Sequence, residues 1–154
     1  RKELVKAVEL SDKLLRATIN KDESTVAEII GEAHQANTSP KFYNNEQALR
    51  SVVIMAYLSS VDDYIRFEEL ASGKGYIDLL FLPALQSSKP ALIIELKWNK
   101  SAEKAIQQEQ DQQYWKFAKQ FRYKGKILLV GINYNSKTKK HTCKIKEIES
   151  LEKN

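Results

Sequence analysis

Charged residues interrupt two of the most apolar segments of the chain. Asp78 lies within YIDLLFL, and Glu95 and Lys97 lie within ALIIELKW. An ionised carboxylate inside an apolar strand costs several kcal/mol unless it is paired or bound to a metal. If the two segments form a hairpin, Asp78 and Glu95 come side by side, where two carboxylates repel each other unless a cation lies between them. Oxygen ligands favour Mg²⁺ or Mn²⁺ over zinc.

The E-x-K spacing within ALIIELKW also has a simpler interpretation. Alternate residues of a strand point to opposite faces, so Ile93, Glu95 and Lys97 share one face. An isolated Glu and Lys at this spacing can be an exposed ion pair at the end of a strand. The Asp in an equally apolar neighbouring segment is the observation that favours a site of chemistry.

Two residues in predicted helices can join this group. Glu46 opens a helix whose other residues are largely apolar, although a carboxylate at a helix N-terminus also interacts favourably with the helix dipole. Gln108 lies in QQEQDQQ, a segment so polar that a solvated helix face explains it equally well. Neither residue indicates a site without support from its surroundings.

Hydrophobic periodicity and breaker residues define the elements that must position these side chains. Predicted helices span residues 3–17, 22–35, 46–60 and 99–121, with Asp22 or Ser24 capping the second. Predicted strands span residues 64–70, 75–83, 91–98, 126–134 and 142–148. Loops or turns are expected at 37–45, 72–75, 84–90 and 135–140.

The order of these elements predicts an α/β fold. Three consecutive strands joined by short connections are expected to be antiparallel neighbours. The helix that follows returns the chain, by a right-handed crossover, to a strand parallel to its predecessor. We therefore expect a mixed sheet with helices packed on it.

Charge is distributed unevenly along the chain. Residues 1–85 carry 10 Lys and Arg against 13 Asp and Glu, whereas residues 86–154 carry 15 against 7, within a net charge of +5. A basic second half suggests a polyanionic partner, with nucleic acid first among the candidates. A lysine-rich solvated surface is the alternative.

Composition excludes several other classes of protein. A chain of 154 residues with 42% hydrophobic residues is sufficient for one globular domain. One cysteine, Cys143, excludes a disulfide framework or a thiolate zinc site, and two histidines are too few for a histidine metal site. No segment is long and apolar enough to span a membrane. The opening RKELVKAVEL is not a signal peptide and lacks Met, so we expect a piece of a longer cytoplasmic protein.

Four separated segments resemble one known family. They are YNNEQAL, ELASGKGYIDLLFLP, KPALIIELKWNKSAEKAIQQ and ILLVGINYNSKTKKHTC. Together they resemble the PD-(D/E)XK nuclease superfamily and, more closely, the C-terminal nuclease-like domain of bacterial AAA-ATPase-like proteins. The resemblance implies a restriction-endonuclease-like mixed sheet with an α-β-β-β-α-β core. It also implies two regions, an N-terminal helical extension (1–40) and a nuclease-like domain (41–154).

The resemblance also implies roles for individual residues. The signature Asp falls on Asp78, the D/E-x-K pair on Glu95 and Lys97, the helix Glu on Glu46, and the Gln of the A-x-x-Q-I helix on Gln108. Departures from the family pattern are Ile77 in place of Pro, Glu109 in place of Ile, and Lys104 in place of a small residue.

A mechanism follows from these roles as a hypothesis. Asp78, Glu95 and the backbone carbonyl of Leu96 would hold Mg²⁺ or Mn²⁺, and Glu46 would bind a second ion directly or through water. Lys97 would orient the attacking water, and Gln108 would contact the substrate or that water. The residues expected to hold the phosphate backbone of nucleic acid, with DNA as the first candidate, are Lys100, Lys104 and Lys119.

Several alternatives stay open from the sequence. The domain could be a non-catalytic module that binds nucleic acid or a partner, a regulatory appendage of an upstream ATPase-like domain, or an enzyme acting on small molecules with the same carboxylates. The sequence also leaves open whether cleavage requires a homodimer or the upstream domain.

Overall fold

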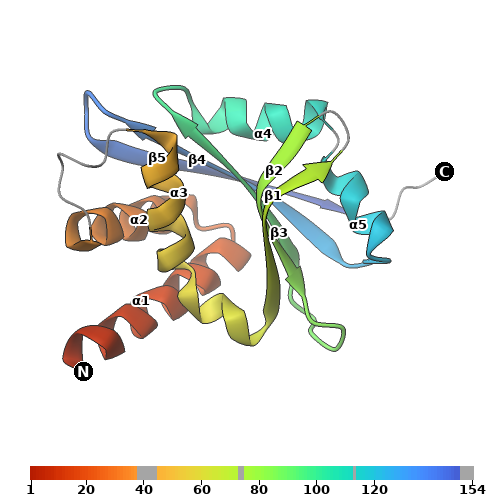
Figure 1. The fold of residues 1–154 in the computed structure, drawn as a ribbon, viewed down its shortest axis with the longest axis horizontal. Helices are drawn as coiled ribbons and strands as arrows, with labels where there is room; N and C mark the ends of the chain where they lie inside the picture. The colour runs from red at the N-terminus through yellow and green to blue at the C-terminus, as the bar shows by residue number, and fades with distance from the viewer. Residues whose placement is uncertain (38–44, 73–74, 113, 150–154) are drawn as a thin grey trace.

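A five-stranded mixed sheet forms the centre of the computed structural model, and helices cover both of its faces (Figure 1). The structure describes residues 1–37, 45–72, 75–112 and 114–149, so most of the predicted loop at 37–45 and part of the turn at 72–75 lie outside it. The helices are α1 (Lys2–Ile19), α2 (Glu23–Asn37), α3 (Glu46–Ala56), η1 (Leu58–Asp62), α4 (Ala102–Asp111), η2 (Tyr114–Lys116) and α5 (Phe117–Gln120). The strands are β1 (Tyr64–Ser72), β2 (Gly75–Pro83), β3 (Ala91–Trp98), β4 (Lys126–Asn135) and β5 (Lys140–Glu149).

The strand order confirms the predicted fold. It is β1-β2-β3-β4-β5, so every strand lies next to its neighbours in the chain. β1, β2 and β3 pair antiparallel, β3 and β4 pair parallel across the helical connection, and β5 returns antiparallel to β4. A mixed α/β sheet of this kind is consistent with the restriction-endonuclease-like fold.

Strand β3 is buried on both faces, as its apolar sequence predicts. Leu92, Ile94 and Leu96 belong to a cluster that also contains side chains of α1, α2 and α3. Ile93 belongs to a second cluster, on the side of α4 and α5, which includes Tyr114 and Phe117. The alternation therefore sends Glu95, with Ile93, towards the face that α4 covers.

The N-terminal helices share a core with the sheet. Leu14 of α1 and Ile30 of α2 are fully buried in the same cluster as Ile94 of β3 and Val130 of β4. Asp22 accepts a hydrogen bond from the backbone N–H of Thr25 and so caps α2. The division into an extension (1–40) and a nuclease-like domain (41–154) stays a prediction.

The long helix predicted from residue 99 to 121 is wrong in extent. α4 ends at Asp111, and η2 and α5 form separate short helices. The inward face of α4 carries Ala102, Ala105 and Glu109. Tyr114, five residues after Glu109, would point about 140° away from that face if the helix continued. The chain changes direction, and Tyr114 becomes 1% exposed.

The bounds of the third helix also need correction. It ends at Ala56 rather than residue 60, and its residue Met55 is apolar but 55% exposed. Leu4, near the start of α1, is 65% exposed, because the first turns of α1 extend beyond the sheet. The two histidines lie together: His34 of α2 packs edge-on against His141 of β5, with ring centroids 5.6 Å apart. Among the described helices, none is long and apolar enough to cross a membrane.

Candidate metal centre

Asp78 and Glu95 meet where β2 and β3 separate. The antiparallel ladder between these strands ends at Leu79 and Ile94, and Asp78 and Glu95 are the next residues in register. Beyond the ladder, the backbone N–H of Leu96 donates to Oδ2 of Asp78 at 2.9 Å. The carboxylate of Asp78 thus satisfies a strand N–H that has passed the end of the ladder. The structure brings the two carboxylates together as the hairpin predicts.

Burial keeps a proton on Glu95. The residue is 3% exposed. Burial, together with a hydrogen bond to Asp78 and the charge of that carboxylate, raises the pKa of Glu95 to about 10, and Lys97 opposes the rise. The carboxyl of Glu95 and the carboxylate of Asp78 form an oxygen-rich pair in which a divalent cation can replace the proton of Glu95.

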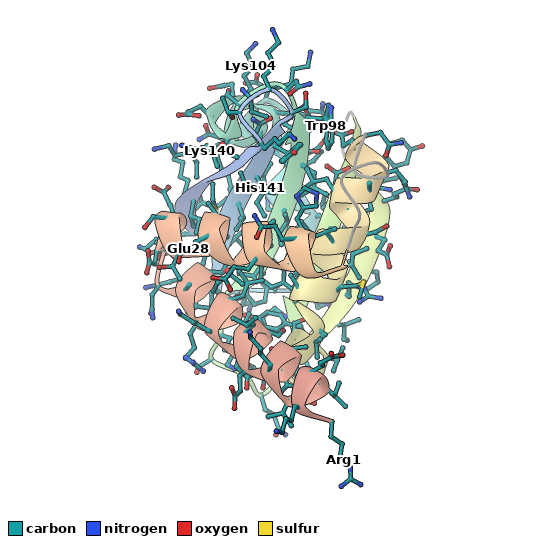
Figure 2. All side chains as sticks on the ribbon, turned by 90° about the vertical axis from the view of Figure 1, so that its left-hand side faces the viewer. Arg1, Glu28, Trp98, Lys104, Lys140 and His141 are labelled. Atoms are coloured by element: carbon teal, nitrogen blue, oxygen red, sulfur yellow. The ribbon has the colours of Figure 1, made fainter. Side chains whose placement is uncertain are left out.

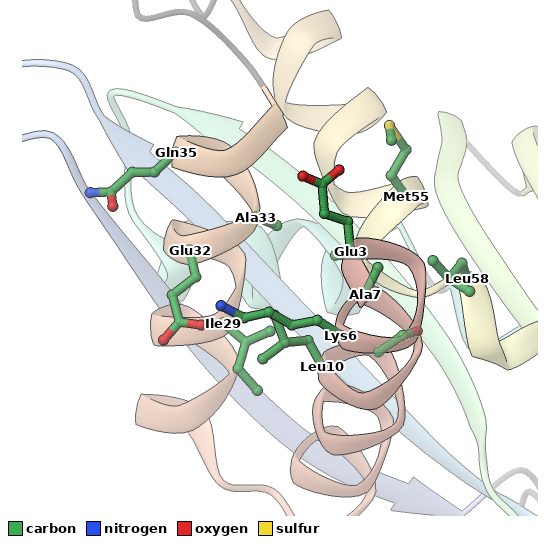
Figure 3. Close-up of a pocket in the computed structure, with 12 residues that line it drawn as sticks. Glu3, Lys6, Ala7, Leu10, Ile29, Glu32, Ala33, Gln35, Met55 and Leu58 are labelled. Atoms are coloured by element: carbon green, nitrogen blue, oxygen red, sulfur yellow. The ribbon is translucent and has the colours of Figure 1, made fainter. Parts of the chain in front are cut away.

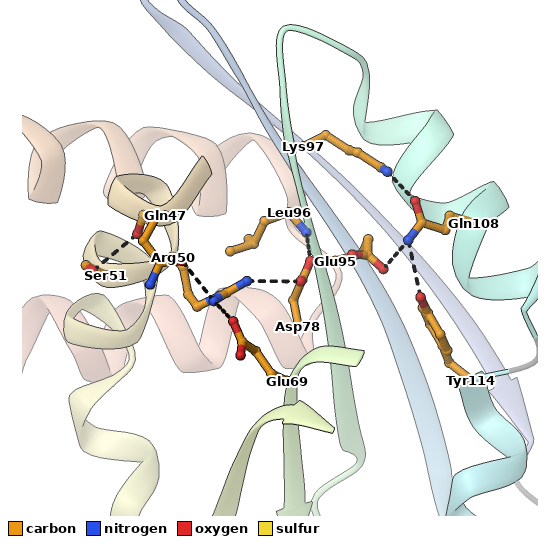
Figure 4. A network of polar contacts seen from close by, with 10 residues as sticks. All are labelled: Gln47, Arg50, Ser51, Glu69, Asp78, Glu95, Leu96, Lys97, Gln108 and Tyr114. Carbon is orange, nitrogen blue, oxygen red and sulfur yellow. Dashed lines mark hydrogen bonds and ion pairs between the residues drawn. The ribbon is translucent and has the colours of Figure 1, made fainter. Parts of the chain in front are cut away.

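Gln108 connects the other predicted residues to this pair (Figure 4). Its Nε2 donates to Oε2 of Glu95 at 3.0 Å and to the hydroxyl of Tyr114 at 3.2 Å. Its Oε1 accepts a hydrogen bond from Nζ of Lys97. The amide of Gln108 therefore has a defined orientation, and it holds the ammonium of Lys97 and the carboxyl of Glu95 on one side of the sheet.

A glycine on β4 allows α4 to approach the sheet closely enough for these contacts. Gly131 pairs with Glu95 across the parallel ladder. A Cβ at Gly131 would lie 2.5 Å from the carbonyl oxygen of Ala102 and 2.8 Å from Cβ of Ala105. Any side chain at this position would push α4, and Gln108 with it, away from Glu95.

Glu46 lies close to the pair without completing a three-carboxylate cluster. It is the first residue of α3, which is capped by the side chain of Asn45. Burial raises the pKa of Glu46, and the charge of Asp78 raises it further. Within the described part of the chain, no group of three or more His, Cys, Asp or Glu side chains is arranged to hold a metal ion. A metal at Asp78 and Glu95 would therefore need backbone oxygen or water as further ligands.

Three charged residues around this centre were not predicted. Arg50 of α3 contacts Asp78 and Glu69, with Nη2 of Arg50 3.4 Å from Oδ1 of Asp78. Arg50 lies four residues after Glu46, so both lie on one helix face, and this spacing can be seen in the sequence.

Glu109 of α4 is fully buried, and neither of its oxygens has a hydrogen-bond partner among the described residues. Nothing local in QQEQDQQ distinguishes it.

The predicted phosphate-binding lysines are exposed but do not form one patch. Lys100 and Lys104 lie at the start of α4, and Lys119 lies on α5, beyond the far end of that helix. Lys104 projects from the same end of the molecule as Lys140 (Figure 2). Lys100 and Lys140 line a groove between α2 and the β4–β5 hairpin.

A second hollow lies away from the carboxylates. It is lined by α1, α2 and the end of α3, with Leu10, Ile29 and Met55 among its apolar side chains (Figure 3). Neither Asp78 nor Glu95 lines this hollow or the groove beside Lys100. The candidate metal centre therefore lies where β2 and β3 separate, apart from both of these hollows.

The donor set fits a hard divalent cation. It consists of carboxylate oxygens, with no thiolate or imidazole among the described residues at the site, and such oxygens suit Mg²⁺ and Mn²⁺. The guanidinium of Arg50 lies beside Oδ1 of Asp78, so an ion bound through this oxygen would have a positive charge as its neighbour.

Comparison with protein families gives a match over the segment of the chain that contains the candidate metal centre. A family model described as PD-(D/E)XK nuclease superfamily matches residues 44–144, which include every element from α3 to the first half of β5. A comparison with curated proteins gave no match.

Proposed function

The chain belongs to the PD-(D/E)XK nuclease superfamily, and on this premise we propose that it hydrolyses phosphodiester bonds in DNA, with Mg²⁺ or Mn²⁺ held by Asp78 and Glu95. The observation that carries the proposal is the convergence of these two carboxyls with Lys97 and Gln108 where β2 and β3 separate. Membership of a nuclease superfamily implies a nucleic-acid substrate and a divalent metal. DNA, the identity of the metal and the roles of individual residues belong to the proposal.

Each residue has a separate task in this proposal. Asp78 and Glu95 bind the ion, the carbonyl oxygen of Leu96 supplies a further ligand, and Glu46 binds a second ion directly or through water. When bound, the ion supplies Lewis-acid chemistry, neutralising phosphoryl oxygens and making water more acidic. Lys97, held by Gln108, orients the attacking water and places an ammonium beside the negative charge that develops on the phosphate.

The proposal is tested by calorimetric titration of Mn²⁺ into the wild type and Asp78→Asn. We expect saturable binding in the wild type and at least a hundredfold loss of affinity in the variant, because Asn keeps the shape but removes the charge and half of the ligand oxygens. Asp62→Asn, at an exposed position in η1, is the matched control and should bind like the wild type. Equal binding by wild type and Asp78→Asn would contradict the assigned site.

The affinity for Mn²⁺ should rise with pH. Since the pKa of Glu95 is raised to about 10, this carboxyl carries a proton at neutral pH, and the ion must displace it. Each bound ion then releases up to one proton, so the affinity should rise by up to about tenfold per pH unit between pH 6 and pH 8. Titrations in buffers of different ionisation enthalpy measure this proton release directly. A pH-independent affinity with no proton release would contradict a protonated Glu95.

Lysines of the second half are proposed to hold the phosphate backbone. The double variant Lys100→Ala and Lys104→Ala should weaken binding to duplex DNA at every sequence and reduce the slope of log affinity against log salt by about two. Lys119→Ala, tested separately, should reduce the slope by about one. Lys2→Ala with Lys13→Ala, both exposed on α1, is the control, and an equal change there would indicate only the loss of net charge.

The other partners are proposed on the resemblance alone. They are an upstream ATPase-like domain and a second copy of this chain in a homodimer. If the wild type does not bind Mn²⁺ with or without DNA, the alternative of a non-catalytic binding module replaces the nuclease proposal.

A further inference from the structure

Arg50 contacts the candidate metal ligand Asp78, although it does not belong to the D…E-x-K pattern. It lies on α3, one turn after Glu46, and its side chain is 11% exposed (Figure 4). Its Nη2 lies 3.4 Å from Oδ1 of Asp78. Its Nη1 contacts the carboxylate of Glu69 and donates to Oε1 of Gln47 at 3.1 Å. A single guanidinium therefore joins a candidate metal ligand to a carboxylate on the edge strand β1.

The guanidinium of Arg50 contacts more than one partner. The contact with Asp78, at 3.4 Å, is longer than the usual range of about 2.7–3.2 Å for such a hydrogen bond, and Arg50 also contacts Glu69 and Gln47. The Nε of Arg50 is buried and has no hydrogen-bond partner among the described residues. One of the donor groups of the guanidinium, Nε, therefore makes no hydrogen bond to the described part of the chain, and the long contact with Asp78 is one that Arg50 can give up.

Glu69 reaches Arg50 from an unusual backbone position. The β1–β2 ladder pairs Glu68 with Leu79 and Leu70 with Ile77, which places Glu69 opposite Asp78. Glu69 has φ 50°, in the left-handed region that residues with side chains rarely adopt. Its carboxylate is 61% exposed. A backbone in this region, directly opposite a candidate ligand, is typical of functional sites.

A divalent ion bound through Oδ1 of Asp78 would meet the guanidinium of Arg50. Oδ2 of Asp78 accepts the backbone N–H of Leu96 at 2.9 Å, and Oδ1 has the longer contact, at 3.4 Å, with Arg50. Two cations at one carboxylate oxygen repel each other, and the repulsion is strong where the side chains are 11% and 15% exposed.

We propose that Arg50 competes with the divalent ion for Asp78, and that Glu69 weakens this competition by drawing the guanidinium towards the edge of the sheet. Arg50 is thus a positioning residue that tunes metal affinity. This role rests on the proposed function, because it requires a metal at Asp78.

The two single variants should change Mn²⁺ affinity in opposite directions. Arg50→Gln removes the competing cation, so calorimetric titration should show binding about threefold to tenfold tighter than wild type. Glu69→Gln leaves Asp78 as the main carboxylate partner of Arg50, so binding should weaken by a similar factor. Glu69 is exposed, so this variant keeps the test available if Arg50→Gln does not fold.

A double variant separates this competition from long-range charge effects. If Glu69 acts through Arg50, Glu69→Gln should leave Mn²⁺ affinity unchanged in the Arg50→Gln background. If both act only through their charge, the two effects should add. Arg66 and Glu68, an ion pair at 3.4 Å on the same strand, provide matched controls: Arg66→Gln and Glu68→Gln should each change the affinity by less than about twofold.

The outcomes distinguish this inference from the proposed function. Wild-type binding that depends on Asp78 but is unchanged in Arg50→Gln and Glu69→Gln would overturn the competition and leave the metal centre intact. Additive effects in the double variant, or equal effects in the control pair, would also overturn it. No Mn²⁺ binding in any variant would overturn the metal centre itself. Binding that appears only when Arg50 is replaced, and that is lost again with Asp78→Asn, would support the inference most strongly.

Discussion

Replacing Lys97 with methionine is expected to reduce DNA cleavage by about a hundredfold to ten-thousandfold while leaving Mn²⁺ binding within a few fold of wild type. Methionine keeps the length of the side chain but has no positive charge and no proton to donate. The ammonium of Lys97 donates a hydrogen bond to Oε1 of Gln108, and Nε2 of the same amide donates to Glu95. Its loss should remove stabilisation of the developing charge without removing a metal ligand. Single-turnover cleavage with saturating Mn²⁺ measures this effect.

Two further variants make the interpretation of Lys97→Met specific. Lys97→Arg keeps the charge and should recover part of the activity. Lys100→Met, three residues later and exposed, should reduce substrate affinity but not the single-turnover rate at saturating DNA. If Lys97→Met abolishes Mn²⁺ binding as well, its main role is to balance the charge of the carboxylates rather than to act on the phosphate. If it has no effect on cleavage, the proposed role of Lys97 is wrong.

Replacing Glu109 with glutamine is expected to stabilise the protein, and the gain should increase with pH. Burial raises the pKa of Glu109 well above 4.5, and the charges of Glu95 and Asp78 raise it further. A carboxyl whose pKa is raised by folding stabilises the folded state most below its unfolded pKa, and this contribution is lost as the pH rises towards the folded pKa. The loss is about 1.4 kcal/mol per pH unit. The free energy of unfolding of the variant should therefore increase relative to that of the wild type as the pH rises above 4.5.

Urea unfolding at several pH values between 4.5 and 8 measures this difference between variant and wild type. Glu103→Gln, at an exposed position on the same helix, is the matched control and should show no pH-dependent gain. Glu109→Ile, the residue that the family pattern has at this position, should be more stable than Glu109→Gln because no unpaired polar atom remains buried. A Glu109→Gln variant that is less stable than wild type at every pH would show that the carboxyl is stabilised in the folded protein.

Glu109 also shows why a buried charge can escape sequence analysis. It follows Gln108 within a run of polar residues, and every residue of that run is compatible with a solvated helix. Its burial depends on how closely α4 approaches β4, which the absent side chain of Gly131 permits. That approach joins residues more than twenty positions apart. The helical spacing from Ala102 and Ala105 places Glu109 on the inward face, but only the approach decides that its carboxyl is buried.

Much of the candidate metal centre was predictable because its geometry depends on short-range rules. Side chains alternate along a strand, and consecutive strands joined by a short connection pair antiparallel. These two rules place Asp78 beside Glu95 and put Lys97 on the same face as Glu95. The same rules, with a helix between parallel strands, determine the order of the sheet.

The tertiary structure alone decided which other charges surround that centre and where the helices end. Arg50 reaches Asp78 because α3 packs against the sheet. Glu69 contacts Arg50 from a backbone with positive φ, which the periodicity of a strand does not predict. The long helix ends at Asp111 because Tyr114 is buried against the sheet, which requires a change of direction. The strands and the face on which the site residues lie follow from side-chain alternation along each strand, and the strand order follows from the lengths of the connections. Burial and ion pairing depend on the surfaces that meet when the chain folds, and only the folded structure brings those surfaces together.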